Sequence, residues 1–395
     1  MTRITKKKYL LGFWYLAIAI GISLAVILRG GSSWAQPAAD VPSPASDAAI
    51  KLVDFCQNPQ GGLDEKAAHI LIDYVLKSKP KKELALPGIR EATGAYYEFD
   101  TKLNFATFLK YSFNHQIPAS LTSPSSLRYS VWNGQPGPSQ KMPATWKKIA
   151  PAGEPLIIRG VQRDAITPDL TTGVYYEYEL QRTFILLNYK GRQALIVVSE
   201  QVDKSNVGKK GLILGNDDDW NYYYSDEPGS ARSGLGWVKS YIYDFFSVAV
   251  YVETTPEDNS VRGGFFQWIS AGWSGVNFVQ THHIIKGMKR HARNFTAIME
   301  SPLLPPAEKI AAAYQRLAAL PIADLRKQYA ALRQAQKTLA VASGKIKKDG
   351  EAGRDLAGNA SKEQIIEELM LEYFKMAMGK NSLLGEKRLL ALINH

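Results

Sequence analysis

A series of strand-like segments joined by short connections occupies residues 172–272. The segments GVYYEYELQRTFILLNY and RQALIVVSEQ are separated only by Lys190-Gly191, a dipeptide typical of a tight hairpin. Further segments follow, each bounded by Gly, Asp, Pro or Asn: GLILG, WNYYYS, GWVKSYIYDFFSVAVYVE and GGFFQWISAG. Parallel neighbours would need crossovers of about a dozen residues or more. The sequence therefore predicts an antiparallel β-meander.

The hydrophobic period changes after the last of these strands. Over residues 276–300 apolar side chains recur at intervals of three and four, which indicates an amphipathic helix that packs on the sheet. Its predicted outer face gathers His282, Lys286, Lys289, Arg290 and Arg293. We therefore expect a meander closed by a helix over residues 171–300.

Helical patterns flank this unit. Residues 47–170 begin with two helical segments and continue as irregular α+β structure, and residues 301–395 are predicted to be helical, with two helices meeting at Pro321. The predicted fold class is α+β. It has a central antiparallel β-meander closed by an amphipathic helix, a helical lead-in and a helical carboxy-terminal region.

The amino-terminal residues 1–35 have the pattern of an export signal. TKKKY supplies a positive segment, residues 10–28 are uncharged, and SWA at 33–35 fits a signal-peptidase site. The uncharged run is also long enough to span a bilayer, so a cleaved signal peptide and a retained anchor are both open. Residues 36–46, rich in Pro, Ala and Ser, are predicted to be a linker to a periplasmic or otherwise extracytoplasmic chain.

The formal net charge of +11 is concentrated at the two ends of the chain. Residues 276–395 carry 19 Lys and Arg against 11 Asp and Glu, and residues 1–35 carry five cations and no acid. The basic helices therefore favour an anionic membrane surface or an envelope protein as partner, and no nucleic-acid partner is predicted.

The strand expected at residues 237–253 is apolar on both faces. One predicted face is aliphatic and includes Ile242 and Phe246; the other is aromatic and includes Tyr241, Tyr243 and Phe245. Because both faces need cover, we expect one to meet a helix and the other a second layer or a ligand cavity. Plain core packing would give the same composition, since Tyr and Phe are favoured in strands.

Asp244 interrupts the predicted aliphatic face. A carboxylate there is costly unless it is paired or hydrogen-bonded. Three explanations remain open: an ion pair with Arg182 or Arg192, a polar anchor for a ligand, or a β-bulge that exposes Asp244 to solvent.

The aspartates in LILGNDDDWNYYYS suggest either a metal site or a turn. The first, third and fifth positions of DDDWN have EF-hand spacing, but a Tyr and a Pro stand where that loop requires Gly and Glu. A solvated turn is therefore predicted, with a looser calcium site that includes Asp226 or Glu227 as the alternative.

No catalytic motif has the required spacing. SAGWSGVNF lacks the second Gly of a hydrolase nucleophile elbow, because Val276 occupies that position. His282 and His283 diverge by about 100° on a helix and cannot chelate one ion as a pair. The sequence therefore assigns no catalytic residue, no metal ligand and no cofactor.

These features predict an exported, non-enzymatic binding protein whose aromatic-rich sheet face holds an apolar or amphipathic small ligand. The predicted ligand contacts are Tyr241, Tyr243, Asp244 and Phe245. The alternative is a cell-envelope scaffold or assembly protein that uses its basic helices to contact anionic lipid or a partner protein, and an enzyme is the third possibility. An enclosed apolar cavity under the aromatic face would favour the first hypothesis.

The export prediction can be tested with reporters fused to the carboxy terminus. A reporter active only in the periplasm should give signal, because the lysine cluster is expected to hold the amino terminus in the cytoplasm. A silent periplasmic reporter together with an active cytoplasmic one would contradict the prediction.

Overall fold

A hairpin turn forms at Lys190-Gly191, where the sequence predicts it. The two residues have φ angles of 51° and 78°, as a two-residue hairpin turn of the I′ type requires. The chain is described here from a computed structural model, which covers residues 40–58, 60–79, 82–134, 154–232, 236–255, 259–347 and 360–393.

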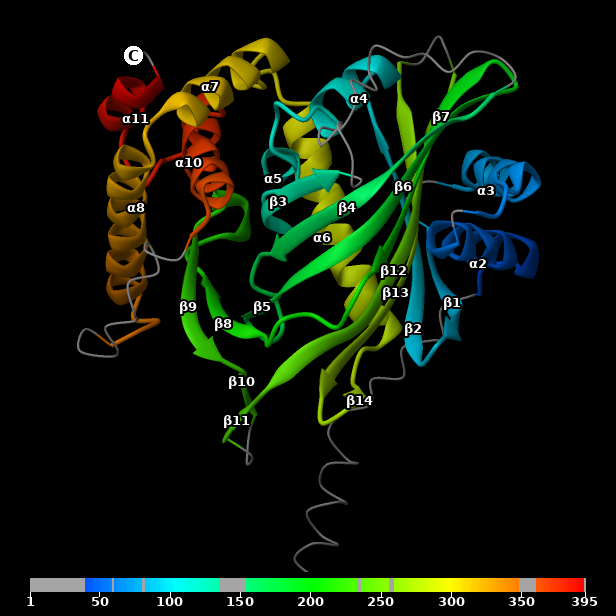
Figure 1. Cartoon of the computed structure of the whole chain (residues 1–395), viewed down its shortest axis with the longest axis horizontal. Coiled ribbons are helices and arrows are strands. Elements are labelled where there is room, and N and C mark those ends of the chain that lie inside the picture. The colour runs from blue at the N-terminus through cyan, green and yellow to red at the C-terminus, as the bar shows by residue number, and fades with distance from the viewer. Residues whose placement is uncertain are drawn as a thin grey trace, which may run out of the picture. The chain divides into compact units, whose positions relative to one another are not determined.

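A nine-stranded antiparallel sheet forms the centre of the structure (Figure 1). From one edge to the other its strands are β1 (Glu83–Ile89), β2 (Ala92–Thr101), β13 (Val261–Trp273), β12 (Ser240–Glu253), β7 (Arg192–Gln201), β6 (Glu177–Tyr189), β4 (Leu156–Ile166) and β3 (Leu127–Gly134), with β14 (Val276–Asn277) paired to β13. Smaller sheets consist of β5 (Val174–Tyr175), β8 (Lys209–Ile213) and β9 (Tyr222–Pro228), and of β10 (Ser230–Arg232) and β11 (Gly236–Val238). The antiparallel order confirms the predicted α+β class.

Helices cover both faces of this curved sheet. The helices are α2 (Ser43–Gln57), α3 (Glu65–Lys77), α4 (Phe105–Ser112), α5 (Ala119–Thr122), α6 (Thr281–Met299), α7 (Ala307–Ala319), α8 (Ile322–Ala342), α10 (Lys362–Ala377) and α11 (Glu386–Ile393). Helices α2 and α3 pack on the outer, convex face, and α6 lies inside the curve on the concave face (Figure 1). The predicted closing helix is therefore present.

The convex face of the central strands is fully buried. In β12 the side chains of Phe246, Val248, Val250 and Val252 have 0% exposure, and they pack in one core with α2 and α3. Burying a side chain of this size contributes about 1.5–3 kcal/mol. The aliphatic face predicted from the sequence meets helices, as expected.

A β-bulge interrupts β12 near its start. Ile242 is opposite Ala271 and Asp244 is opposite Ser270, so Tyr243 has no partner on β13. Such an extra residue reverses the alternation of faces on either side of it. Ile242 consequently does not share a face with the aliphatic residues above the bulge, and that part of the sequence prediction is wrong.

The sheet extends beyond the segment predicted to form it. Strands β1 to β4 come from residues 83–166, which the sequence predicted only as irregular structure. Helix α2 begins at Ser43, inside the predicted linker 36–46, because Pro44 is tolerated in the first helical turn. Val41 is also already buried.

The carboxy-terminal helices separate at Pro321, as predicted. Helix α10 then packs against neighbours that include α7, α8 and β3, and α11 follows within the region predicted to be helical. Helix α10 also buries several charged side chains, namely Glu367, Glu368, Glu372 and Lys375. Three acids and one cation of this helix therefore lie inside the protein.

The predicted export segment, residues 1–35, lies outside the described residues. Within the ranges that are described, no helix combines the length and the hydrophobicity that a bilayer crossing requires.

Replacing Phe246 with Ala should lower the free energy of unfolding by about 3–5 kcal/mol, because it leaves a cavity in a fully buried core. The neighbouring residue Ser247 points to the other face, and Ser247→Ala should change the free energy of unfolding by no more than about 1 kcal/mol. Chemical denaturation of both variants measures this difference. Equal losses would contradict the assignment of the two faces.

Candidate functional site

The concave face carries a row of polar residues between two apolar rows. The polar row runs across four adjacent strands as Gln267, Ser247, Ser199 and Arg182, each directly opposite the next. The row above it consists of Phe265, Ala249, Val197 and Phe184. Below it lie Ile269 and Phe245, which are paired, and Leu180 on β6. Directly opposite residues share a face of a sheet, so all of these side chains lie on the concave side.

Arg182 is bound by neutral partners. Its Nε donates to Ser199 Oγ at 2.9 Å, and its Nη1 donates to Gln162 Oε1 at 2.8 Å. Gln162 Nε2 in turn donates to Asp164 Oδ1 at 2.8 Å. The arginine thus reaches the nearest carboxylate of this network only through an amide.

Gly160 leaves room for an aromatic ring beside Arg182. It lies opposite Arg182 on β4, and a Cβ at this position would lie 2.3 Å from the ring of Trp132. Any larger residue would push the indole away from the sheet. The polar row is therefore bordered by Trp132 on the β3 side.

The concave side chains of β12 and β13 remain partly accessible. Phe245, Ser247, Ala249 and Tyr251 are half-buried, whereas their convex neighbours are fully buried, and β13 alternates in the same way. Helix α6 packs mainly along β2 and less along β13. Phe108 of α4 also contacts Tyr251, and the concave residues Leu195, Val197 and Ser199 of β7 are buried. Only the concave side chains of β12 and β13 are thus less completely covered than the convex ones.

Several half-buried groups around the concave face are nonetheless strongly desolvated. Burial lowers the pKa of His291 on α6 to about 4, so its imidazole is neutral at pH 7. Burial also raises the pKa of Tyr178 and of Tyr251 above the ordinary tyrosine value. These rings lie away from bulk water and yet keep accessible surface.

The structure separates the four residues predicted to bind the ligand. Phe245 lies on the concave face, with its ring centroid 5.9 Å from that of Tyr178. Tyr241 and Asp244 lie opposite alternate residues of β13 that share a face with Trp268, so both point to the convex side. Tyr243, at the bulge, accepts a hydrogen bond from the backbone N–H of Gly275 at 2.8 Å. Their role as ligand contacts remains a prediction.

Asp244 faces Arg90 and not the predicted partners Arg182 or Arg192. Burial raises the pKa of Asp244, and the nearby Arg90 opposes that rise. Arg90 itself donates to Glu200 at 2.7 Å. Asp244 is half-buried beside this ion pair. The bulge therefore does not expose it fully to solvent.

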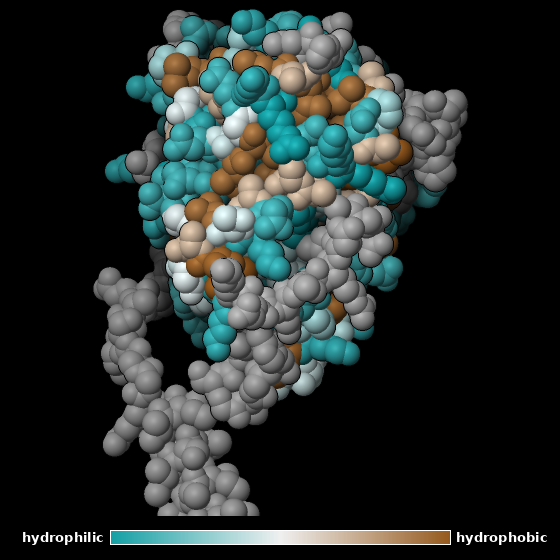
Figure 2. Space-filling model, turned by 90° about the vertical axis from the view of Figure 1, so that its left-hand side faces the viewer, coloured by the Kyte–Doolittle hydropathy of each residue, from teal (hydrophilic) through white to brown (hydrophobic). Residues whose placement is uncertain are grey.

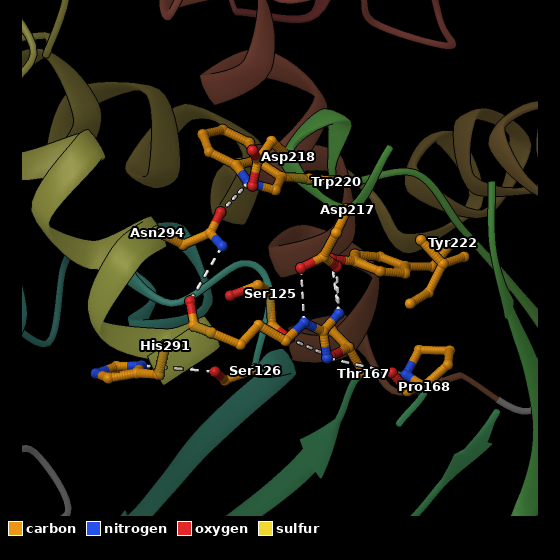
Figure 3. Close-up of polar contacts among 12 residues, drawn as sticks. Ser125, Ser126, Thr167, Pro168, Asp217, Asp218, Trp220, Tyr222, His291 and Asn294 are labelled. Carbon is orange, nitrogen blue, oxygen red and sulfur yellow. Dashed lines mark hydrogen bonds and ion pairs between the residues drawn. The ribbon is translucent and has the colours of Figure 1, made fainter. Parts of the chain in front are cut away.

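The three aspartates form a turn that is anchored to α6 (Figure 3). Asp217 accepts two hydrogen bonds from Arg290, one of them from Nε at 2.7 Å, and it also accepts from Tyr222. Asp218 pairs with Arg293 at 3.1 Å. The turn is confirmed, but Asp217 is not solvated.

The predicted basic outer face of α6 is smaller than expected. Arg290 is buried against the aspartate turn, and Lys289 pairs with Glu83 on β1. A side chain that pairs with an acid contributes less to an attraction for anionic surfaces. The sequence pattern could not place these acids, because they come from distant segments.

His291 lies near a serine without forming a catalytic triad (Figure 3). Its Nδ1 is 3.5 Å from Ser126 Oγ, at the limit for a hydrogen bond. The other neighbours of the ring are Phe99, Phe265 and Phe295. Among the described residues no carboxylate is hydrogen-bonded to this imidazole, as the base of a catalytic triad would require.

Two hollows on the described surface lie away from the predicted ligand contacts. One of about 540 Å³ lies between α4 and α7 and is lined in part by Lys110 and Glu308. The other, of about 520 Å³, lies along α8 and is lined mainly by Ala and Leu. On that side of the molecule hydrophobic and hydrophilic residues alternate (Figure 2).

The sequence did not reveal the polar row. Each member was nonetheless visible as a polar residue inside an apolar strand: Arg182 in ELQRTFILL, Ser199 in LIVVSE, Ser247 in DFFSVAV and Gln267 in FFQWIS. What was missing was the register, which alone brings the four side chains into one line.

No family model and no curated protein matches this chain. A solved structure, the human StarD13 (DLC2) lipid transfer and protein localization domain, matches 60% of this chain and 95% of its own length. The sequence identity is 9% and the TM-score is 0.27, which is too low to support a common fold or function.

The consecutive aspartates should differ sharply in their effect on stability. Asp217→Ala leaves the buried Arg290 without its partner and should cost about 3–5 kcal/mol. Asp218, which is 63% exposed, forms only a surface pair, and Asp218→Ala should cost less than about 1 kcal/mol. Thermal and urea unfolding of the two variants provides the comparison. A similar loss of stability in both variants would show that the turn, and not the ion pair with Arg290, stabilises this region.

Proposed function

We propose that this chain is a non-enzymatic binding protein that holds an apolar or amphipathic small molecule against the concave face of its sheet. The observation that carries the proposal is the contrast between the two faces of β12 and β13. From Phe246 to Val252 the convex side chains of β12 are fully buried, whereas the concave side chains beside them and on β13 keep accessible surface in the middle of a nine-stranded sheet. Protein interiors are normally packed too closely to leave side chains accessible.

The desolvated groups on the concave face also support the proposal. A side chain beside bulk water would keep an ordinary pKa. Burial shifts the pKa of His291, Tyr178 and Tyr251 although all three are half-buried. Groups with perturbed pKa values beside apolar walls are a feature of small-molecule sites, which supports the proposal.

The chemistry of the walls favours a ligand with both apolar and polar parts. Above the polar row lie Phe265 and Ala249, and below it lie Ile269 and Phe245. Apolar rows of this kind accept a hydrocarbon or aromatic body, and the polar row fixes its orientation. Phe245 is the residue that this site shares with the contacts predicted from the sequence.

We also propose that the protein acts outside the cytoplasm, on the basis of the lysine cluster and uncharged run in residues 1–35. The alternative function, contact of the basic helices with anionic lipid or an envelope protein, has less support. Arg290 and Lys375 are buried and Lys289 and Arg293 pair with acids, and no contact among the described residues points to a membrane or an envelope protein.

Two matched substitutions test for space above the concave face. Ala249→Phe adds a ring on the half-buried concave side and should leave stability within about 1 kcal/mol of wild type while displacing a bound ligand. Val248→Phe adds similar bulk on the fully buried convex side and should cost about 1–3 kcal/mol through overpacking.

Denaturation curves and native mass spectrometry of both variants and the wild type provide the readouts. A co-purifying small molecule that is present in the wild type and in Val248→Phe, but absent from Ala249→Phe, would support the proposal. Equal destabilisation by the two substitutions would mean that the concave face is ordinary packed core and would overturn it.

A further inference from the structure

Arg182 has unused hydrogen-bonding capacity at the centre of the concave face. A guanidinium has five N–H donors, and the contacts of Arg182 employ Nε and Nη1, with Ser199 and Gln162 as acceptors. Among the described residues no partner is present for Nη2. Arg182 is half-buried, so this edge is not sealed within the protein.

The charge of Arg182 is balanced only indirectly. No Asp or Glu of the described chain forms an ion pair with it, and Asp164 is reached through Gln162. Asp164 is itself buried and also accepts from Ser130 Oγ at 2.6 Å. An arginine held inside a fold without a direct counter-ion is costly unless an anion completes the arrangement.

The ionisable groups that face Arg182 from the surrounding strands leave room for one more negative charge. Tyr178 and Tyr251 are neutral at pH 7, as tyrosines ordinarily are, and burial raises their pKa values further. Glu200, although adjacent to Ser199 in sequence, alternates to the convex face and pairs with Arg90. The concave face therefore offers a partly desolvated cation flanked by hydroxyl and amide groups.

We propose that Arg182 binds the carboxylate head of an amphipathic ligand, with Ser247 and Gln267 along the same row as further hydrogen-bonding groups. This inference rests on the proposed function and specifies its ligand class. Arginine suits the role because its planar fork matches the two oxygens of a carboxylate. The apolar rows on either side of the polar row then contact the ligand's hydrocarbon body.

The wild-type protein by itself tests the head-group preference. The full chain, stripped of co-purifying molecules, is titrated by calorimetry at pH 7.5 with dodecanoate, dodecanol and dodecylammonium, which differ only in the head group. Dodecanoate should bind at least about tenfold more tightly than dodecanol, and dodecylammonium most weakly.

A matched pair of variants then assigns the preference to Arg182. Arg182→Gln should weaken dodecanoate binding about tenfold or more and change dodecanol binding less than about threefold. Arg159→Gln removes the same charge from the adjacent strand β4, where Arg159 donates to Thr183 and to the carbonyl of Phe55 on the convex side. It should leave the preference for dodecanoate unchanged.

The outcomes separate this inference from the proposed function. Equal binding of dodecanoate and dodecanol to the wild type would overturn the assignment of Arg182 to a carboxylate. The proposed function as a binding protein would still stand. Absence of binding by all three compounds would count against both. If Arg182→Gln does not fold, as judged by circular dichroism, the wild-type head-group series still decides the inference.

Discussion

The packing of α2 and α3 on the convex face is the interaction on which the rest of this structure depends. It buries the aliphatic residues of β12 completely and joins them to Trp268 and Phe266 on β13 in one core. Because this core stabilises the central strands from one side, their other side does not have to be packed to the same density. The concave face has a core of its own, which buries Phe184 and Val197, but the polar row and the half-buried rings of β12 and β13 interrupt its packing.

The bulge at Tyr243 limits how far the division between a convex and a concave set of side chains extends along β12. Above the bulge, even-numbered residues face α2 and α3, and odd-numbered residues face α6. Below it the relation is reversed, so Tyr241 and Phe245, which a strict alternation would place together, lie on opposite faces. The candidate site thus begins at Phe245 and continues toward Tyr251, away from Tyr241 and Tyr243.

Internal ion pairs hold several cations of the carboxy-terminal region. Arg290 binds Asp217, and Lys375 binds Glu372 within α10 and also Asn221 near the aspartate turn. Arg128 on β3 pairs with Glu368, which lies on α10. These contacts attach the carboxy-terminal helices to the sheet region. By contrast, Arg182 has no such acidic partner among the described residues, which is why it is the cation singled out as a ligand contact.

The sequence by itself determined the α+β class, the antiparallel hairpin at Lys190-Gly191, the amphipathic helix after the last strand and the break at Pro321. Each of these follows from local periodicity or turn chemistry, which acts over a few residues. Only the tertiary structure decided that residues 83–166 complete the sheet, that Asp217 meets Arg290, and that Arg182, Ser199, Ser247 and Gln267 form one row. The reason is that strand register, a single bulge and pairings between segments far apart are set by the packing of the whole chain, and no window of sequence contains both partners.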